Sequence, residues 1–226
     1  MTKFSKSFYL NNYDIFKDCR TLLDAVILTK YLKWNTQCKT FLEIGVEKGA
    51  SFSIVFGARP DVICYLIDPD FSKFKKNIPE HFIKNAIFFQ TKSNEMNWEE
   101  IPIIDFVLLD GDPKFPTPVN DAKAFLNKVN DNSIIALSWV HHPDTHHTRK
   151  YLKDNGWTRW IKLDNSEWWA KKDLQPFIDH VMHNDAGLLK YSRIIKANSD
   201  NDFKWEITAP QFVYDNVELV KKYIQD

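Results

Sequence analysis

The chain has 226 residues, with 30 basic and 30 acidic side chains, so its formal net charge is zero at pH 7. This length suits one α/β domain with a small appendage. The balanced charge gives no sign of the basic surface that nucleic acids and anionic membranes attract. A nucleic-acid or membrane partner is therefore not indicated.

The cysteines Cys19, Cys38 and Cys64 are too few and too widely spaced for a disulfide framework or a zinc site. This usage fits a reducing cytoplasm. Residues 1–6 lead into no long apolar stretch, so no secretory signal peptide is expected. No run approaches the roughly 18 apolar residues that a membrane span needs. We expect a soluble, cytoplasmic protein.

Strand and helix patterns alternate along most of the chain. Apolar residues at near-helical spacing predict a helix over 14–34, ahead of the first strand. Strands are predicted at 40–44, 62–67, 86–90, 104–109 and 133–137, and a closing hairpin at 157–163 and 167–171. Helices are predicted at 50–58, from about 119 to 129, and within 141–155. This alternation indicates a parallel sheet with helices packed on it.

Residues 174–226 do not continue this pattern. They predict a helix over 177–189, a strand over 204–208 and a final helix over 213–224. We therefore expect a core of residues 1–173 and a C-terminal α+β extension, residues 174–226, that packs on the core.

The segment after the first strand has the spacing Glu43-x-Gly45-x-x-x-Gly49-x-Ser51. It predicts a strand, a glycine turn and a helix whose N-terminus faces the turn. Glycines let a ligand lie close to the backbone. The spacing differs from the Gly-x-Gly-x-x-Gly of dinucleotide sites, which disfavours a nicotinamide-dependent oxidoreductase.

Polar residues also follow the next three strands. Asp68 follows the second strand, where a carboxylate can accept hydrogen bonds from both hydroxyls of a ribose. Ser93 and Asn94 follow the third strand, and Asp110 and Asp112 follow the fourth in the sequence Asp-Gly-Asp. Parallel strands bring these side chains to one edge of the sheet, where ligands of open α/β sheets bind.

Over residues 35–173 these motifs resemble class I S-adenosylmethionine-dependent methyltransferases. The Asp-Gly-Asp form is similar to that of small-molecule and sugar O-methyltransferases. The resemblance implies a Rossmann-like, seven-stranded sheet with helices on both faces, and S-adenosylmethionine as cofactor. It places adenine contacts at the end of the third strand. The candidate cofactor-binding residues are Glu43, Gly45, Gly49, Ser51, Asp68, Ser93 and Asp110.

Methylation of a hydroxyl requires a base, or a divalent metal that lowers the hydroxyl's pKa. Asp112, His141 and His142 are the candidate catalytic residues, because the histidines follow the fifth strand at the same sheet edge. The sequence 141–147 holds four histidines, and imidazole is both a base near neutral pH and a metal ligand. Alternatively, this segment is only the exposed start of a helix, capped by Asp144 or Thr145.

Two positions depart from the resemblance. Relatives often have a histidine after Asp-Gly-Asp and an acid at the end of the fifth strand. Here Pro113 and the pair Ser138-Trp139 occupy these positions, which weakens the case for a metal site built from carboxylates.

These observations favour O-methylation of a small molecule or glycan hydroxyl. Two alternatives remain: a methyltransferase acting on nucleic acid or protein, and a non-catalytic module that retains the fold and binds the cofactor.

Overall fold

The computed structural model describes residues 8–19, 21–184, 192–197 and 202–210. Its strands are β1 Thr40–Ile44, β2 Ile63–Ile67, β3 Ala86–Phe89, β4 Phe106–Leu109, β5 Ile134–Ser138, β6 Thr158–Lys162, β7 Ser166–Ala170, β8 Arg193–Lys196 and β9 Phe203–Thr208. Its α-helices are α1 Phe8–Asn11, α2 Tyr13–Phe16, α3 Leu22–Trp34, α4 Ala50–Ala58, α5 Ser72–Asn77, α6 Thr117–Phe125, α7 Thr145–Asp154 and α8 Gln175–Asn184. Short 3-10 helices are η1 Glu80–Asn85, η2 Ser93–Glu95, η3 Trp98–Glu100 and η4 Leu126–Lys128. No helix in these described ranges combines the length and apolar character that a membrane crossing requires.

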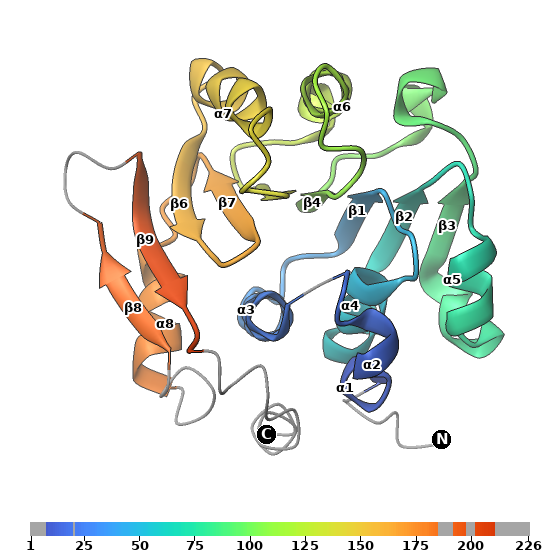
Figure 1. Cartoon of the computed structure of the whole chain (residues 1–226), viewed down its shortest axis with the longest axis horizontal. Helices are drawn as coiled ribbons and strands as arrows, with labels where there is room; N and C mark the ends of the chain where they lie inside the picture. Colours follow the sequence, from blue (N-terminus) through green and yellow to red (C-terminus); the bar gives the residue numbers. More distant parts are fainter. Residues whose placement is uncertain (1–7, 20, 185–191, 198–201, 211–226) are drawn as a thin grey trace.

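The strands form one sheet in the order β3-β2-β1-β4-β5-β7-β6-β9-β8 (Figure 1). Strands β1 to β5 are parallel, and β7 runs antiparallel to both of its neighbours, β5 and β6. The predicted Rossmann-like α/β sheet with a closing hairpin is therefore confirmed. Because β1 to β4 point the same way, the residues that follow them meet at one edge.

The expected number of seven strands is wrong, because two C-terminal strands extend the same sheet. Strand β9 pairs in parallel with β6, and β8 pairs antiparallel with β9. Buried Trp205 and Ile207 give β9 the alternation that predicted it. Strand β8 was not predicted. Its two half-buried isoleucines lie between exposed Arg193 and Lys196, and four residues are too short a pattern to indicate a strand. The predicted helix over 213–224 lies outside the described residues.

Helices cover both faces of the sheet, with α3, α4 and α8 on one face and α6 and α7 on the other (Figure 1). Neighbouring residues of β1 belong to different cores: Phe41 packs in the cluster with α3 and α4, and Leu42 in the cluster with α6 and α7. A strand buried on both faces needs apolar residues at nearly every position. This explains the continuous apolar runs in the sequence.

The single helix predicted over 14–34 is interrupted in the structure. Helix α2 ends at Phe16 and α3 begins at Leu22, after an N-cap at Thr21. The hydroxyl oxygen of Thr21 accepts a hydrogen bond from the backbone N–H of Asp24 at 3.1 Å. Such a cap starts a new helix. The apolar spacing continues across the break, so periodicity alone did not reveal it.

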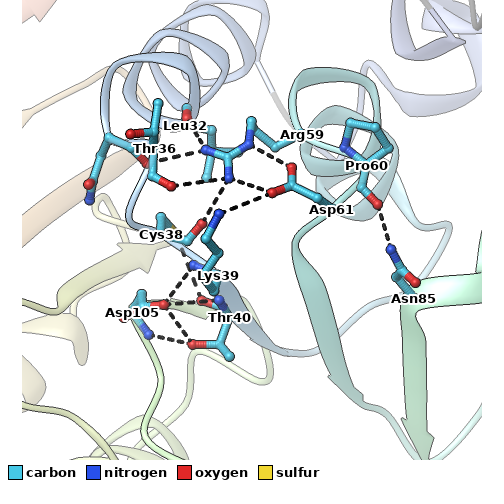
Figure 2. A network of polar contacts seen from close by, with 11 residues as sticks. Leu32, Thr36, Cys38, Lys39, Thr40, Arg59, Pro60, Asp61, Asn85 and Asp105 are labelled. Carbon is cyan, nitrogen blue, oxygen red and sulfur yellow. Dashed lines mark hydrogen bonds and ion pairs between the residues drawn. The ribbon is translucent and has the colours of Figure 1, made fainter.

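A polar network joins the strand ends that lie opposite the glycine turn (Figure 2). The guanidinium of Arg59 donates two hydrogen bonds of 2.7 Å to the carboxylate of Asp61. It also donates to carbonyls in the last turn of α3 and in the segment that leads to β1, those of Leu32, Asn35, Thr36 and Cys38. Beside it, the carboxylate of Asp105 accepts hydrogen bonds from the backbone N–H groups of Lys39 and Thr40. Asp105 therefore fixes the start of β1 against β4, away from the candidate site.

Candidate functional site

A cavity of about 420 Å³ lies at the sheet edge where β1 to β4 end. Its wall combines residues that follow these four strands with residues from the first turns of α6. Three of the predicted site residues line it: Gly45, Ser93 and Asp112. A volume of this size is within the range of small-molecule and cofactor sites.

The turn after β1 has an unusual backbone. Gly45 and Gly49 have φ angles of 86° and 85°, and Glu47 between them has a φ of 46°. A Cβ atom at Gly45 would lie 2.5 Å from the carbonyl oxygen of Asp110, in the loop after β4. Gly45 is therefore required by the close approach of two backbone segments, and this approach forms one corner of the cavity.

Asp68, predicted to hold a ribose, interacts with the same turn. Its Oδ2 accepts hydrogen bonds from the backbone N–H groups of Val46 and Glu47, at 2.8 and 3.0 Å. Its Oδ1 accepts one from the N–H of Asp70 at 2.8 Å. A carboxylate offers about four acceptor positions, so these bonds leave little capacity for other donors. In this structure Asp68 shapes the turn, and its neighbour Pro69 lines the cavity.

Three other predicted residues belong to the buried junction around the turn. Glu43 and Ser51 are each 1% exposed. A Cβ atom at Gly49 would lie 2.7 Å from the ring of Phe74 and 2.8 Å from Ile78, so this glycine permits α4 to pack closely against α5. None of the three lines the cavity.

The loop after β4 carries the Asp-Gly-Asp sequence. Asp110 is half-buried, and its carbonyl oxygen lies 3.5 Å from the indole Nε1 of Trp139, beyond β5. Asp112 is exposed at the cavity rim, and its Oδ1 accepts a hydrogen bond from the N–H of Lys114 at 3.0 Å. Between them, Gly111 also lines the cavity.

Asp121, on α6, lines the cavity and was missed by the sequence analysis. It is 3% exposed, and its Oδ1 accepts a hydrogen bond from the hydroxyl of Ser93. Burial raises the pKa of the Asp121 carboxyl to about 6; the Ser93 hydroxyl opposes this rise and Asp112 adds to it. In the sequence, Asp121 was marked only by its position: it lies one turn into the helix that follows the Asp-Gly-Asp loop.

The histidine segment forms the approach to α7. His141 is exposed, and its Nε2 lies 2.6 Å from the carbonyl oxygen of Asp164, in the β6–β7 turn. The Nδ1 of His142 accepts a hydrogen bond from the N–H of Asp144 at 3.3 Å. Among the described residues, no hydrogen bond joins Asp112 to either histidine.

The ends of α7 and α6 are also linked here. Asp144 is the N-cap position of α7, but its side chain instead accepts a hydrogen bond from the N–H of Phe115, before α6. Within the part of the chain that the structure describes, no three His, Cys, Asp or Glu side chains are grouped so as to hold a metal ion.

Comparisons with known proteins give structural matches only. No family model matches the sequence, and no curated protein matches it. A putative caffeoyl-CoA O-methyltransferase from Staphylococcus aureus has 13% identity and a TM-score of 0.59, over 71% of this chain and 88% of that one. An SAH-bound methyltransferase from Podospora anserina has 11% identity and a TM-score of 0.58, over 75% and 86% of the two chains.

A third solved structure extends this comparison to another type of methyltransferase. A precorrin-6y C5,15-methyltransferase from Geobacter metallireducens has 16% identity and a TM-score of 0.51, over 68% of this chain and 89% of that one. At such identities a likeness concerns the fold alone. The chain has the Rossmann-like fold of these methyltransferases.

Proposed function

We propose that this protein is an S-adenosylmethionine-dependent methyltransferase that methylates a hydroxyl group of a small molecule or a glycan. The observation that carries this proposal is the cavity of about 420 Å³, bounded by the ends of four parallel strands in a fold shared with methyltransferases. Ligands of open α/β sheets bind at this edge.

The residues present suit the cofactor. The turn at Gly45 brings backbone to the cavity, and Ser93 and Asn94, which follow β3, add polar residues to its lining. Glu43, Gly49, Ser51, Asp68 and Asp110 are proposed to form and hold the turn and the facing loop. When bound, S-adenosylmethionine would supply a methyl group activated by its sulfonium.

Cofactor binding gives the first test. We expect S-adenosylmethionine and S-adenosylhomocysteine to bind in the micromolar range in calorimetric titrations, and NAD not to bind. Asp68→Ala should weaken this binding by about 1–3 kcal/mol, because the turn loses its charged acceptor. Asp70→Ala is the matched control, since the side chain of exposed Asp70 accepts hydrogen bonds from Ser72 and, among the described residues, from no other. Equal affinity in the Asp68 variant and the wild type would exclude this role.

For the proton of the acceptor hydroxyl we propose Asp112 together with His141 or His142. A neutral His141 that donates from Nε2 to the Asp164 carbonyl has Nδ1 available as an acceptor. Burial raises the pKa of Asp164 to about 6, with Asp24 adding to the rise and His141 opposing it. Asp164 thus titrates beside the proposed base.

The catalytic residues are tested by turnover. Asp112→Asn and His141→Ala should each lower kcat about 10²-fold or more, with nearly unchanged cofactor affinity, if they remove the proton. A chelator should then have little effect. If a divalent metal activates the hydroxyl instead, chelation should abolish turnover and the added ion should restore it. Wild-type turnover in both variants would exclude them from catalysis. His146→Ala is a control, because the contacts of His146 in the described part of the chain are with the Pro143 carbonyl and the ring of His147.

The neutral charge supports a small-molecule or glycan substrate over a nucleic acid. A salt-sensitive affinity for polynucleotide would instead favour the nucleic-acid alternative. Trp139 stands where relatives often have an acid, which supports the non-catalytic alternative. A measurement of cofactor turnover would distinguish a non-catalytic module from an enzyme.

The free Cys19, Cys38 and Cys64 support a place in the cytoplasm.

A further inference from the structure

Another cavity, of about 360 Å³, lies at the sheet edge opposite the candidate site. Strand β7 runs antiparallel to β5 and to β6, and β9 is parallel to β6, so β6 and β9 begin at the edge where β5 begins. The cavity is lined by the end of α7, the starts of β6 and β9 and one residue of β7 (Figure 1). None of the candidate site residues lines it.

Cationic side chains outnumber acids in the wall of this cavity. Lys153, on α7, and Lys204, on β9, are exposed and have no acidic partner in the described part of the chain. Arg159, on β6, is buried, and Asp202 is the one acid in the described wall. The two lysine charges are therefore unbalanced, and an anion is the ligand that this cavity favours.

Arg159 is held in place from inside the protein. Its Nη1 donates a hydrogen bond of 2.7 Å to the carboxylate of Glu167, whose side chain is fully buried. Its guanidinium also lies over the ring of Phe203, 5.1 Å from the ring centroid. A buried ion pair is often no more stabilising than apolar residues of similar volume. Stability therefore does not explain why a fixed guanidinium stands at this cavity.

Asp202 contacts the outer side of the same guanidinium. It forms an ion pair with Nη2 of Arg159, although its own side chain is 55% exposed. An ion pair with one partner in water contributes little, so a ligand can replace Asp202 at small cost. Arg159 has five N–H donors and bonds two of them to Glu167 and Asp202. Donors therefore remain for an oxyanion.

We propose that this cavity is a second binding site, which takes a phosphate group. A phosphate oxygen replaces Asp202 on Nη2 of Arg159, and Lys153 and Lys204 pair with the other oxygens. A phosphate monoester carries about −1.5 to −2 charges near neutral pH, which matches the two unbalanced lysines. The cavity has the size of a small-molecule site, so it can hold a phosphate that carries an organic group.

The test uses glucose 6-phosphate and inorganic phosphate as probes, and glucose as the uncharged comparison. In NMR titrations of the full chain, a phosphate should bind with a Kd of about 1 mM or lower and shift the amide signals of residues 156–159 and 202–204. Glucose should not bind. Tighter binding of the sugar phosphate supports the site and assigns it to a monoester, whereas equal affinities support it and assign it to free phosphate.

Variants of the cavity should change the affinity in opposite directions. Lys153→Ala combined with Lys204→Ala should weaken phosphate binding about tenfold, because two exposed charges are lost. Asp202→Asn should strengthen it about threefold, because the internal competitor loses its charge. Lys150→Ala is the matched control, since this exposed lysine on α7 pairs with Asp154 and does not line the cavity. It should leave the Kd unchanged.

The opposite signs separate binding from folding, since a merely structural Asp202 would not oppose a ligand. Weaker binding in Asp202→Asn, or an unchanged Kd in the double lysine variant, would overturn the proposal. Amide shifts confined to the glycine turn after β1, or no binding of either phosphate by the wild type, would do the same. The site does not depend on the proposed methyltransferase activity, which the titration with S-adenosylmethionine tests separately.

Discussion

Gly45→Ala is expected to lower the free energy of unfolding by about 3–5 kcal/mol. A φ of 86° costs a residue with a Cβ atom about 1–2 kcal/mol. The new Cβ would also lie 2.5 Å from the Asp110 carbonyl oxygen and 2.6 Å from the Cα of Gly111. Both contacts are with backbone, so relief requires the turn and the facing loop to separate, at a further cost of about 1–3 kcal/mol.

Gly156→Ala is the matched control for this prediction. Gly156 has a φ of 82°, but the nearest atom to its Cβ position is the Cε of Lys171, at 3.9 Å. It should therefore lose only the conformational part, about 1–2 kcal/mol. Urea denaturation of both variants measures the difference. Similar losses at the two glycines would show that the close approach of the two loops contributes nothing to stability.

The same geometry changes how a loss of binding at Gly45 is interpreted. The sequence predicted a glycine because a ligand needs the space, whereas the structure fills that space with the backbone of the β4 loop. A Gly45 variant that loses the cofactor therefore reports on the shape of the cavity. Variants at Ser93 and Asp112, which line the cavity, would test the proposed contacts with the ligand.

The core sheet was predictable because its signal is local. Strand β1 was predicted with the bounds Thr40–Ile44, and α4 with the bounds Ala50–Ala58. A parallel strand buried on both faces is apolar throughout, and Pro60 marks the end of the helix region. The Rossmann-like type of the sheet followed from the resemblance. The extension of the sheet by β8 and β9 depends on pairing with β6, across some 40 residues, and no local pattern encodes it.

The site was predictable only in part. The motifs placed Gly45, Ser93 and Asp112 at the correct edge, because each follows a strand of the parallel sheet. They did not show that Asp68 is engaged by the backbone of the turn, since that depends on the path of the chain after Gly45. Asp121 was missed because its burial results from the packing of α6 against the loop after β3.

Glu167→Ala is expected to lower the free energy of unfolding by about 3–5 kcal/mol, the usual cost of leaving buried charges without their partner. The Glu167 side chain, on β7, is fully buried. It accepts hydrogen bonds from Arg149 at 3.0 Å, from Arg159 at 2.7 Å and from the indole of Trp169 at 3.0 Å. Arg159 is itself only 6% exposed; it would keep its ion pair with Asp202, whose side chain is 55% exposed, but would lose its buried partner.

Glu206→Ala is the matched control, because Lys162 is its one cationic partner among the described residues and 28% of its side chain is exposed. It should cost less than about 1 kcal/mol. Chemical denaturation should therefore separate the two variants by at least about 2 kcal/mol. A Glu167 variant as stable as the Glu206 variant would show that the two arginines find other partners. Arg149 also donates to the Val140 carbonyl at 2.8 Å, so losing Glu167 should disturb the adjoining histidine segment too.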